Sequence, residues 1–285
     1  MYADDTSLIV TSRQRISLPH LFDEAFLKLS HWFKVNGLQL NSEKSQLVTF
    51  QINNHNNLSS DSTHLSSNFK EMLSTKFLGL VIDSSLTWRQ HVNQLLPKLS
   101  QAFYAILTLA YSVNDNILRD VYFAYVNSLL SYGVIFWRNS TDSKKIFLMQ
   151  KKIVRLISKV PLREPCKRLF QSLGILPLPS LYIFHCLLFI QSHYISFLGV
   201  NHVHHHYTRN SSILQYPIHR TTFFERAPRY ACIKMYNNLP ISIQKEVVGG
   251  RFKKQLFSFL LSNCFYSVEE YLAFRPDSSG WPLFI

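Results

Sequence analysis

The sequence predicts an α+β chain in which a few strands in the first 88 residues precede a mainly helical remainder. Strand-like runs bounded by turn residues occur at 46–50 and 77–88. From residue 89 onward, apolar residues recur at helical spacings of three and four between segments marked by Gly or Pro. The 285 residues suffice for one large domain or two small ones, and their hydrophobic share of 47% is ample for a buried core.

Charge and cysteine content narrow the class of function. The net charge of +13 favours a polyanionic partner, nucleic acid first and an anionic membrane surface second. The four cysteines are widely spaced and form no C-x-x-C pair, which argues against a zinc knuckle or a dense disulfide framework. We therefore expect reduced, buried thiols in an intracellular protein, nuclear or cytoplasmic. No signal-peptide pattern is visible at the N-terminus.

Two adjacent carboxylates, Asp4 and Asp5, lie just before the β-favouring run at 8–10. Adjacent acids at a turn between strands provide the hard oxygen ligands that suit Mg²⁺. Two metal ions in such a site can hold the attacking and leaving oxygens of a phosphoryl transfer. Taken alone, the pair is more typical of an acidic surface turn.

An amphipathic helix is predicted at 19–36, with Gly37 placed to end it in a left-handed conformation. Its apolar face comprises Leu21, Phe22, Ala25, Phe26, Leu29, Trp32 and Phe33. The segment containing Lys44 then leads into an alternating strand at 46–50. Taken alone, Lys44 is an exposed turn lysine. Residues 51–70 are rich in Asn, Ser and His, which predicts a flexible surface loop.

A second strand-like stretch follows at 77–82 and contains Gly79. Residues 83–85 have turn composition, and residues 86–88 are predicted to return as a short strand. A glycine within a strand often permits a close backbone approach. The plain interpretation is a β-hairpin of the core.

Together these stretches resemble the reverse transcriptases of non-LTR (LINE-like, jockey/CR1-type) retrotransposons, from the catalytic motif onward. The sequence Tyr-Ala-Asp-Asp at 2–5 matches the catalytic turn of that family. Gly-Leu-x-Leu-Asn-x-x-Lys-Ser at 37–45 matches the next palm motif, and Phe-Leu-Gly-Leu at 77–80 matches the primer grip. The resemblance is strong over residues 1–88, moderate over 89–199 and weak beyond.

This resemblance implies a partial palm of antiparallel strands plus one helix at 1–88, a helical thumb at 89–160 and a helical C-terminal region at 161–285. The implied parent activity is RNA-directed DNA polymerisation on an RNA template and a DNA primer. In that reaction the primer 3′-hydroxyl attacks the α-phosphate of a deoxynucleotide.

The resemblance also assigns roles to individual residues. Asp4 and Asp5 would bind Mg²⁺, with Mn²⁺ as an alternative, if the palm is complete. Lys44 would assist the departing pyrophosphate, and the primer would be held by Phe77, Leu78, Gly79 and Leu80. The family's fingers and a further palm aspartate have no counterpart in these 285 residues, so we expect the fragment to be inactive alone.

Helices are predicted to follow residue 88. Ser85 or Thr87 can cap the first of them, and Pro97 predicts a kink or a break within it. Asn114 or Asp115 is expected to start the next helix, whose inward residues are Ile117, Leu118, Val121, Tyr122, Tyr125 and Leu129 and which ends near Gly133.

A strongly basic helix is predicted at 142–159. Its apolar side carries Ile146, Met149, Ile153 and Ile157. The opposite side carries Lys144, Lys151, Arg155 and Lys159, flanked by Lys145 and Lys152. Such a stripe is a plausible track for nucleic-acid phosphates. A solvated basic face is an equally good explanation.

The stretch 180–198 is very apolar and long enough to test as a membrane span. Polar residues interrupt it, so a buried core helix is preferred and no membrane partner is expected. The histidines at 202 and 204–206 lack acidic or cysteine partners at ligand spacing, which favours a solvated loop over a metal site. Further helices are predicted at 230–237 and 241–261.

Besides the parent polymerase, three explanations stay open at this stage. The chain could be a non-catalytic nucleic-acid-binding module built on the helices after residue 88. It could be a membrane-associated protein anchored by residues 180–198. It could also be a translated relic of a decayed element.

Overall fold

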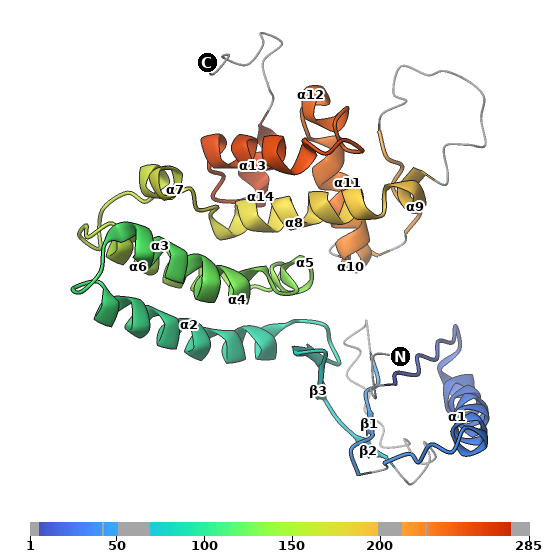
Figure 1. Ribbon diagram of the computed structural model, residues 1–285. Helices are drawn as coiled ribbons and strands as arrows, with labels where there is room; N and C mark the ends of the chain where they lie inside the picture. The colour runs from blue at the N-terminus through green and yellow to red at the C-terminus, as the bar shows by residue number, and fades with distance from the viewer. Residues whose placement is uncertain are drawn as a thin grey trace, which may run out of the picture. The chain divides into compact units, whose positions relative to one another are not determined.

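The computed structural model describes residues 6–41, 43–50, 69–198, 213–219, 221–225 and 227–274. The structure is α+β and mostly helical, with two short two-stranded sheets. The chain divides into two compact units, residues 1–86 (unit 1) and 87–285 (unit 2) (Figure 1).

Unit 1 contains the predicted amphipathic helix, α1 (Leu18–Val35), which follows a 3₁₀ turn, η1 (Arg15–Ser17). A proline occupies its first turn, and Gly37 beyond its end has φ +66°. Its aromatic residues Phe22 and Phe26 pack against Phe69, with ring centroids 6.4 and 4.9 Å away. The prediction of this helix and of its glycine stop is confirmed.

The strands of unit 1 are shorter than predicted and not all antiparallel. Strand β1 (Gln46–Leu47) pairs in parallel with β2 (Lys70–Glu71), and β3 (Ser74–Phe77) pairs antiparallel with β4 (Leu80–Asp83). The strand predicted at 46–50 is thus limited to 46–47, and the expected antiparallel pairing is present in β3 and β4 but not in β1 and β2. A parallel pair requires a long connection, and residues 48–69 provide it.

The hairpin turn lies five residues earlier than predicted. It is formed by Leu78 and Gly79, with φ values of 45° and 82°. Positive φ at both central positions is typical of the type I′ turn, which hairpins favour because its backbone twist matches that of the flanking strands. Gly79 therefore makes the turn rather than lying inside a strand. A second turn at Asp83–Leu86, closed by a 2.9 Å backbone hydrogen bond, confirms the turn predicted at 83–85, whereas the return strand predicted at 86–88 does not form.

Unit 2 begins with α2 (Arg89–Leu109), which runs unbroken through Pro97. The break, one of the two outcomes predicted, is therefore absent. Pro97 and Asn93, the residue whose carbonyl loses its partner, both lie on the exposed side, where water can bond to that carbonyl. The start also differs from prediction. The residue before the helix is Trp88, in a left-handed conformation, and neither Ser85 nor Thr87 occupies the cap position.

The next helical segment is continuous and consists of α3 (Asp115–Val121), a π-helical turn, η2 (Tyr122–Asn127), and α4 (Ser128–Ser131). The predicted Asn114 cap is confirmed, since its side chain accepts a 3.0 Å hydrogen bond from the Ile117 amide. Leu118 and Tyr122 are buried as predicted, together with Val126 and Leu130. The wider π turn keeps this spacing of four on one face, which leaves Tyr125 exposed. Ile117, in α3 before the π turn, was also predicted to face inward and is exposed.

The core of unit 2 is organised around α8 (Leu178–Ser192), which is buried along most of its length. Helices from earlier and later in the chain pack against it from both sides (Figure 1). The remaining elements are α5 (Val134–Trp137), α6 (Ser143–Ile157), α7 (Lys167–Leu173), α9 (Tyr194–Leu198), α10 (Thr222–Glu225), α11 (Pro228–Asn237), α12 (Ile241–Gln244), α13 (Phe252–Asn263) and α14 (Val268–Ala273).

Two predicted long helices are broken in the structure. The stretch 180–198 divides at His193 into α8 and α9. The stretch 241–261 is divided into α12 and α13 by turns at 245–251, which contain Gly249 and Gly250. Within the described part of the chain, no single helix has the length and apolarity of a membrane span. Helices α7 and α8 reach that threshold only together, with a bend of 52° between them. All four cysteines are buried and free, as expected.

Candidate nucleic-acid interface

Helix α6 has two chemically distinct sides. Ile146, Ile153, Val154 and Ile157 are fully buried on one side. The cations predicted from the sequence lie on the opposite side, either exposed or half-buried. We call this set the basic face; it comprises Lys144, Lys151, Lys152, Arg155 and, just beyond the helix, Lys159.

The amide of Gln150 fixes the buried side of α6. Its Nε2 atom donates to the hydroxyl of Tyr122 at 2.8 Å and to the carbonyl of Leu176 at 2.9 Å. Its Oε1 atom accepts from the Leu178 amide at 2.8 Å. Gln150 thereby joins α6 to η2 and to the start of α8, and it holds the basic face on a rigid support. The role of Gln150 was not predicted from the sequence. Its position, four residues after Ile146 and three before Ile153, was the available signal.

The members of the basic face differ in how far their charge is compensated. Lys144 and Lys152 are exposed and form no ion pair with any residue the structure describes. Lys159 pairs with Asp115 at 2.9 Å, but both side chains are more than half exposed. Arg155 donates its Nε proton to the backbone carbonyl of Glu164 at 2.8 Å, so its charge is not neutralised by this bond.

Lys145, which flanks the basic face, is the better neutralised cation. It lies 2.8 Å from Asp142, whose carboxylate also contacts Arg89 at 3.2 Å. The hydrogen bond from Lys145 lowers the pKa of Asp142, so this carboxylate stays charged. Lys145 therefore adds less free positive charge to α6 than Lys144 or Lys152 does.

Aromatic rings support the middle of the basic face. The Lys151 Nζ atom lies 4.7 Å from the ring centre of Phe147 and 5.9 Å from that of Tyr266. The two rings pack edge to face with centroids 5.3 Å apart. Cation–π contacts of this kind hold a lysine in place without removing its charge. The ammonium group therefore remains available to an anion.

The candidate residues of unit 1 lie around its two small sheets. Lys44 is exposed in the turn before β1, where its backbone amide donates to the Asn41 side chain at 3.1 Å. Gln46 at the start of β1 accepts a 2.6 Å hydrogen bond from Thr75 on β3, which ties the Lys44 turn to the hairpin. Leu78 and Gly79 form the hairpin tip, while Phe77 and Leu80 end the strands beside it.

The predicted metal ligands Asp4 and Asp5 lie outside the described residues, as do the histidines at 202 and 204–206. Within the described ranges, no group of three His, Cys, Asp or Glu side chains is placed to hold a metal ion. Mg²⁺ or Mn²⁺ binding therefore stays a prediction from the sequence.

Comparisons with protein-family models, with curated proteins and with solved structures give no significant match.

Proposed function

We propose that this chain is a nucleic-acid-binding fragment of a non-LTR retrotransposon reverse transcriptase, and that the basic face contacts the phosphate backbone. The observation that supports binding is the arrangement of α6. One side of this helix is locked into the core, and the other presents cations that are largely uncompensated.

The dimensions of the basic face suit a nucleic-acid strand. Eleven residues separate Lys144 from Arg155, which corresponds to about 16 Å along a helix axis. This length spans about five phosphates of one duplex strand at their axial spacing. The exposed pair between Lys159 and Asp115 is no obstacle, because surface ion pairs contribute only about 0–1 kcal/mol and can be exchanged for a phosphate.

The proposed ancestry rests on the motifs at 2–5, 37–45 and 77–80. The parent enzyme would copy RNA into DNA with Mg²⁺ at Asp4 and Asp5. Sequencing the reading frame upstream of Met1 tests this part of the proposal. Continuation into fingers and a palm strand with a further aspartate would support it, whereas an unrelated upstream sequence would leave the catalytic role as ancestry only.

The binding proposal is tested with the exposed pair Lys144 and Lys152. The variant Lys144→Glu/Lys152→Glu should bind a labelled single-stranded oligonucleotide more weakly, as measured by fluorescence anisotropy. If each lysine contacts one phosphate, the slope of log affinity against log salt should fall by about 1.4.

A matched control is Lys234→Glu/Lys245→Glu, which makes the same charge change at two exposed lysines outside α6. An equal loss of affinity in both variants would mean that only the net charge of the protein matters, and it would contradict the proposal. Asp5→Ala should leave binding unchanged, because phosphate contacts on α6 do not require the metal ligands.

A further inference from the structure

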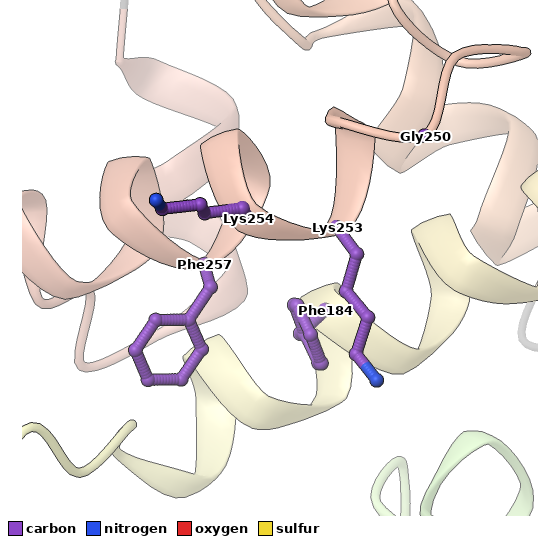
Figure 2. Close-up of a pocket in the computed structure, with 5 residues that line it drawn as sticks. All are labelled: Phe184, Gly250, Lys253, Lys254 and Phe257. Atoms are coloured by element: carbon purple, nitrogen blue, oxygen red, sulfur yellow. The ribbon is translucent and has the colours of Figure 1, made fainter.

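A pocket of about 390 Å³ lies between α8 and α13, away from the basic face. It is lined by Phe184, Gly250, Lys253, Lys254 and Phe257 (Figure 2). Its volume is within the usual range for small-molecule sites, at the lower end. Phe184 comes from α8, while the other four residues belong to α13 or the turn before it.

The lining of the pocket combines two aromatic rings with two lysines. Phe184 is 8% exposed and packs edge to face against the half-buried ring of Phe257, with centroids 5.9 Å apart. Lys253 and Lys254 are exposed, and neither forms an ion pair within the described part of the chain. Figure 2 shows Lys253 extending beside Phe184, while Lys254 extends along α13 on the Phe257 side.

We propose that this pocket holds one base of a single-stranded nucleic acid, stacked on Phe257, with the adjacent phosphates on Lys253 and Lys254. The proposal rests on the nucleic-acid binding proposed above and adds a second subsite to it. Proteins that bind single strands without sequence preference combine cations along the backbone with aromatic side chains on which bases stack. The pocket supplies both within one turn of α13.

The shape of the pocket favours a base over a lipid. A lipid acyl chain needs a long apolar channel, but the apolar lining here consists of two phenyl rings. A planar base needs only one accessible ring face and a limited depth. Each of the two lysines can neutralise the single negative charge of one flanking phosphate.

Two oligonucleotides of equal length isolate the contribution of the base: oligo(dT) and its abasic counterpart, which has the same phosphates. Phe257→Ala should weaken binding of oligo(dT) about fivefold or more, since stacking contributes about 1–3 kcal/mol per base and 1.4 kcal/mol is tenfold. Binding of the abasic strand should change less than twofold. Lys253→Glu/Lys254→Glu should weaken both strands, and more than Lys234→Glu/Lys245→Glu does.

A substitution at Gly250 tests the pocket in a second way, without changing Phe184 or Phe257. A Cβ atom built on Gly250 meets nothing within 4 Å, and its φ is not in the left-handed region, so Gly250→Leu should fold normally and add bulk at the edge of the pocket. This variant should also lose affinity for oligo(dT) selectively. Circular dichroism checks that Phe257→Ala and Gly250→Leu remain folded.

The possible results separate this inference from the proposed function. If the wild-type chain binds oligo(dT) but Phe257→Ala and Gly250→Leu bind it equally well, the pocket proposal is overturned and the basic face stands. If the wild type binds neither strand, both proposals fail. If the pocket variants instead lose binding to phosphatidylserine vesicles with oligo(dT) affinity unchanged, the site belongs to an anionic lipid and the base subsite is refuted.

Discussion

The substitution Gln150→Leu removes the three hydrogen bonds that hold α6 in place. It leaves the Leu178 amide, the Leu176 carbonyl and the Tyr122 hydroxyl without this partner in a site where Gln150 is 1% exposed. Each unsatisfied buried group costs about 1–3 kcal/mol. The apolar leucine recovers part of this by its own burial, so we expect a loss of about 3–5 kcal/mol in the free energy of unfolding.

Urea unfolding followed by circular dichroism measures this loss, with Gln101→Leu as the control. Gln101 is exposed on α2, so the same chemical change there should stay within about 0.5 kcal/mol. Adding Tyr122→Phe to Gln150→Leu should recover about 1 kcal/mol, because it removes one of the unsatisfied groups. A loss below about 1 kcal/mol for Gln150→Leu would show that the amide does not anchor α6.

Two further predictions concern pH and backbone conformation. Burial, followed by the nearby charge of Lys253, lowers the pKa of His185 below its usual 6.5. The folded protein therefore binds fewer protons than the unfolded chain below pH 6.5, so the contribution of His185 is intact above that pH and is lost as the pH falls. The decrease in Tm between pH 7.5 and 5.5 should be smaller in His185→Gln, and an identical pH profile would exclude this role. Gly174 has φ +64°, and a Cβ there would lie 3.3 Å from the Arg119 guanidinium. Gly174→Ala should therefore cost about 1–2 kcal/mol in thermal or urea unfolding, and a neutral result would contradict the strain.

The amphipathic helices were predictable because one local pattern defines each of them. Helix α1 was anticipated from its apolar spacing and from Gly37, and α6 from the separation of its isoleucines from its lysines. The Asn114 cap could also be predicted, because a cap depends on one side chain and the backbone three residues on. These features require no information from distant parts of the chain.

The hairpin could not be placed because the sequence offers two turn signals within seven residues. Asp83, Ser84 and Ser85 have typical turn composition, and the structure does turn there. The tight hairpin instead uses Leu78 and Gly79, although a leucine with positive φ is uncommon. Pairing between β3 and β4 determines which of the two turns forms the hairpin, and this pairing cannot be predicted from the turn residues alone.

Features that depend on two separated elements were missed entirely. The role of Gln150 requires knowing that η2 and the start of α8 meet α6 at one point. The aromatic pocket likewise brings Phe184 next to Phe257, 73 positions later in the sequence. Adjacent lysines such as Lys253 and Lys254 look like ordinary surface charge until such a partner is known.

The central position of α8 has a consequence for how the protein is made. Helices α4, α5 and α6, which pack on one part of α8, are synthesised before it, whereas α11, α13 and α14 are synthesised after it. A ribosome that has just released α8 therefore presents a helix whose apolar surface is only partly covered. It stays so until about 80 more residues have emerged, a period in which chaperones would find a natural binding site.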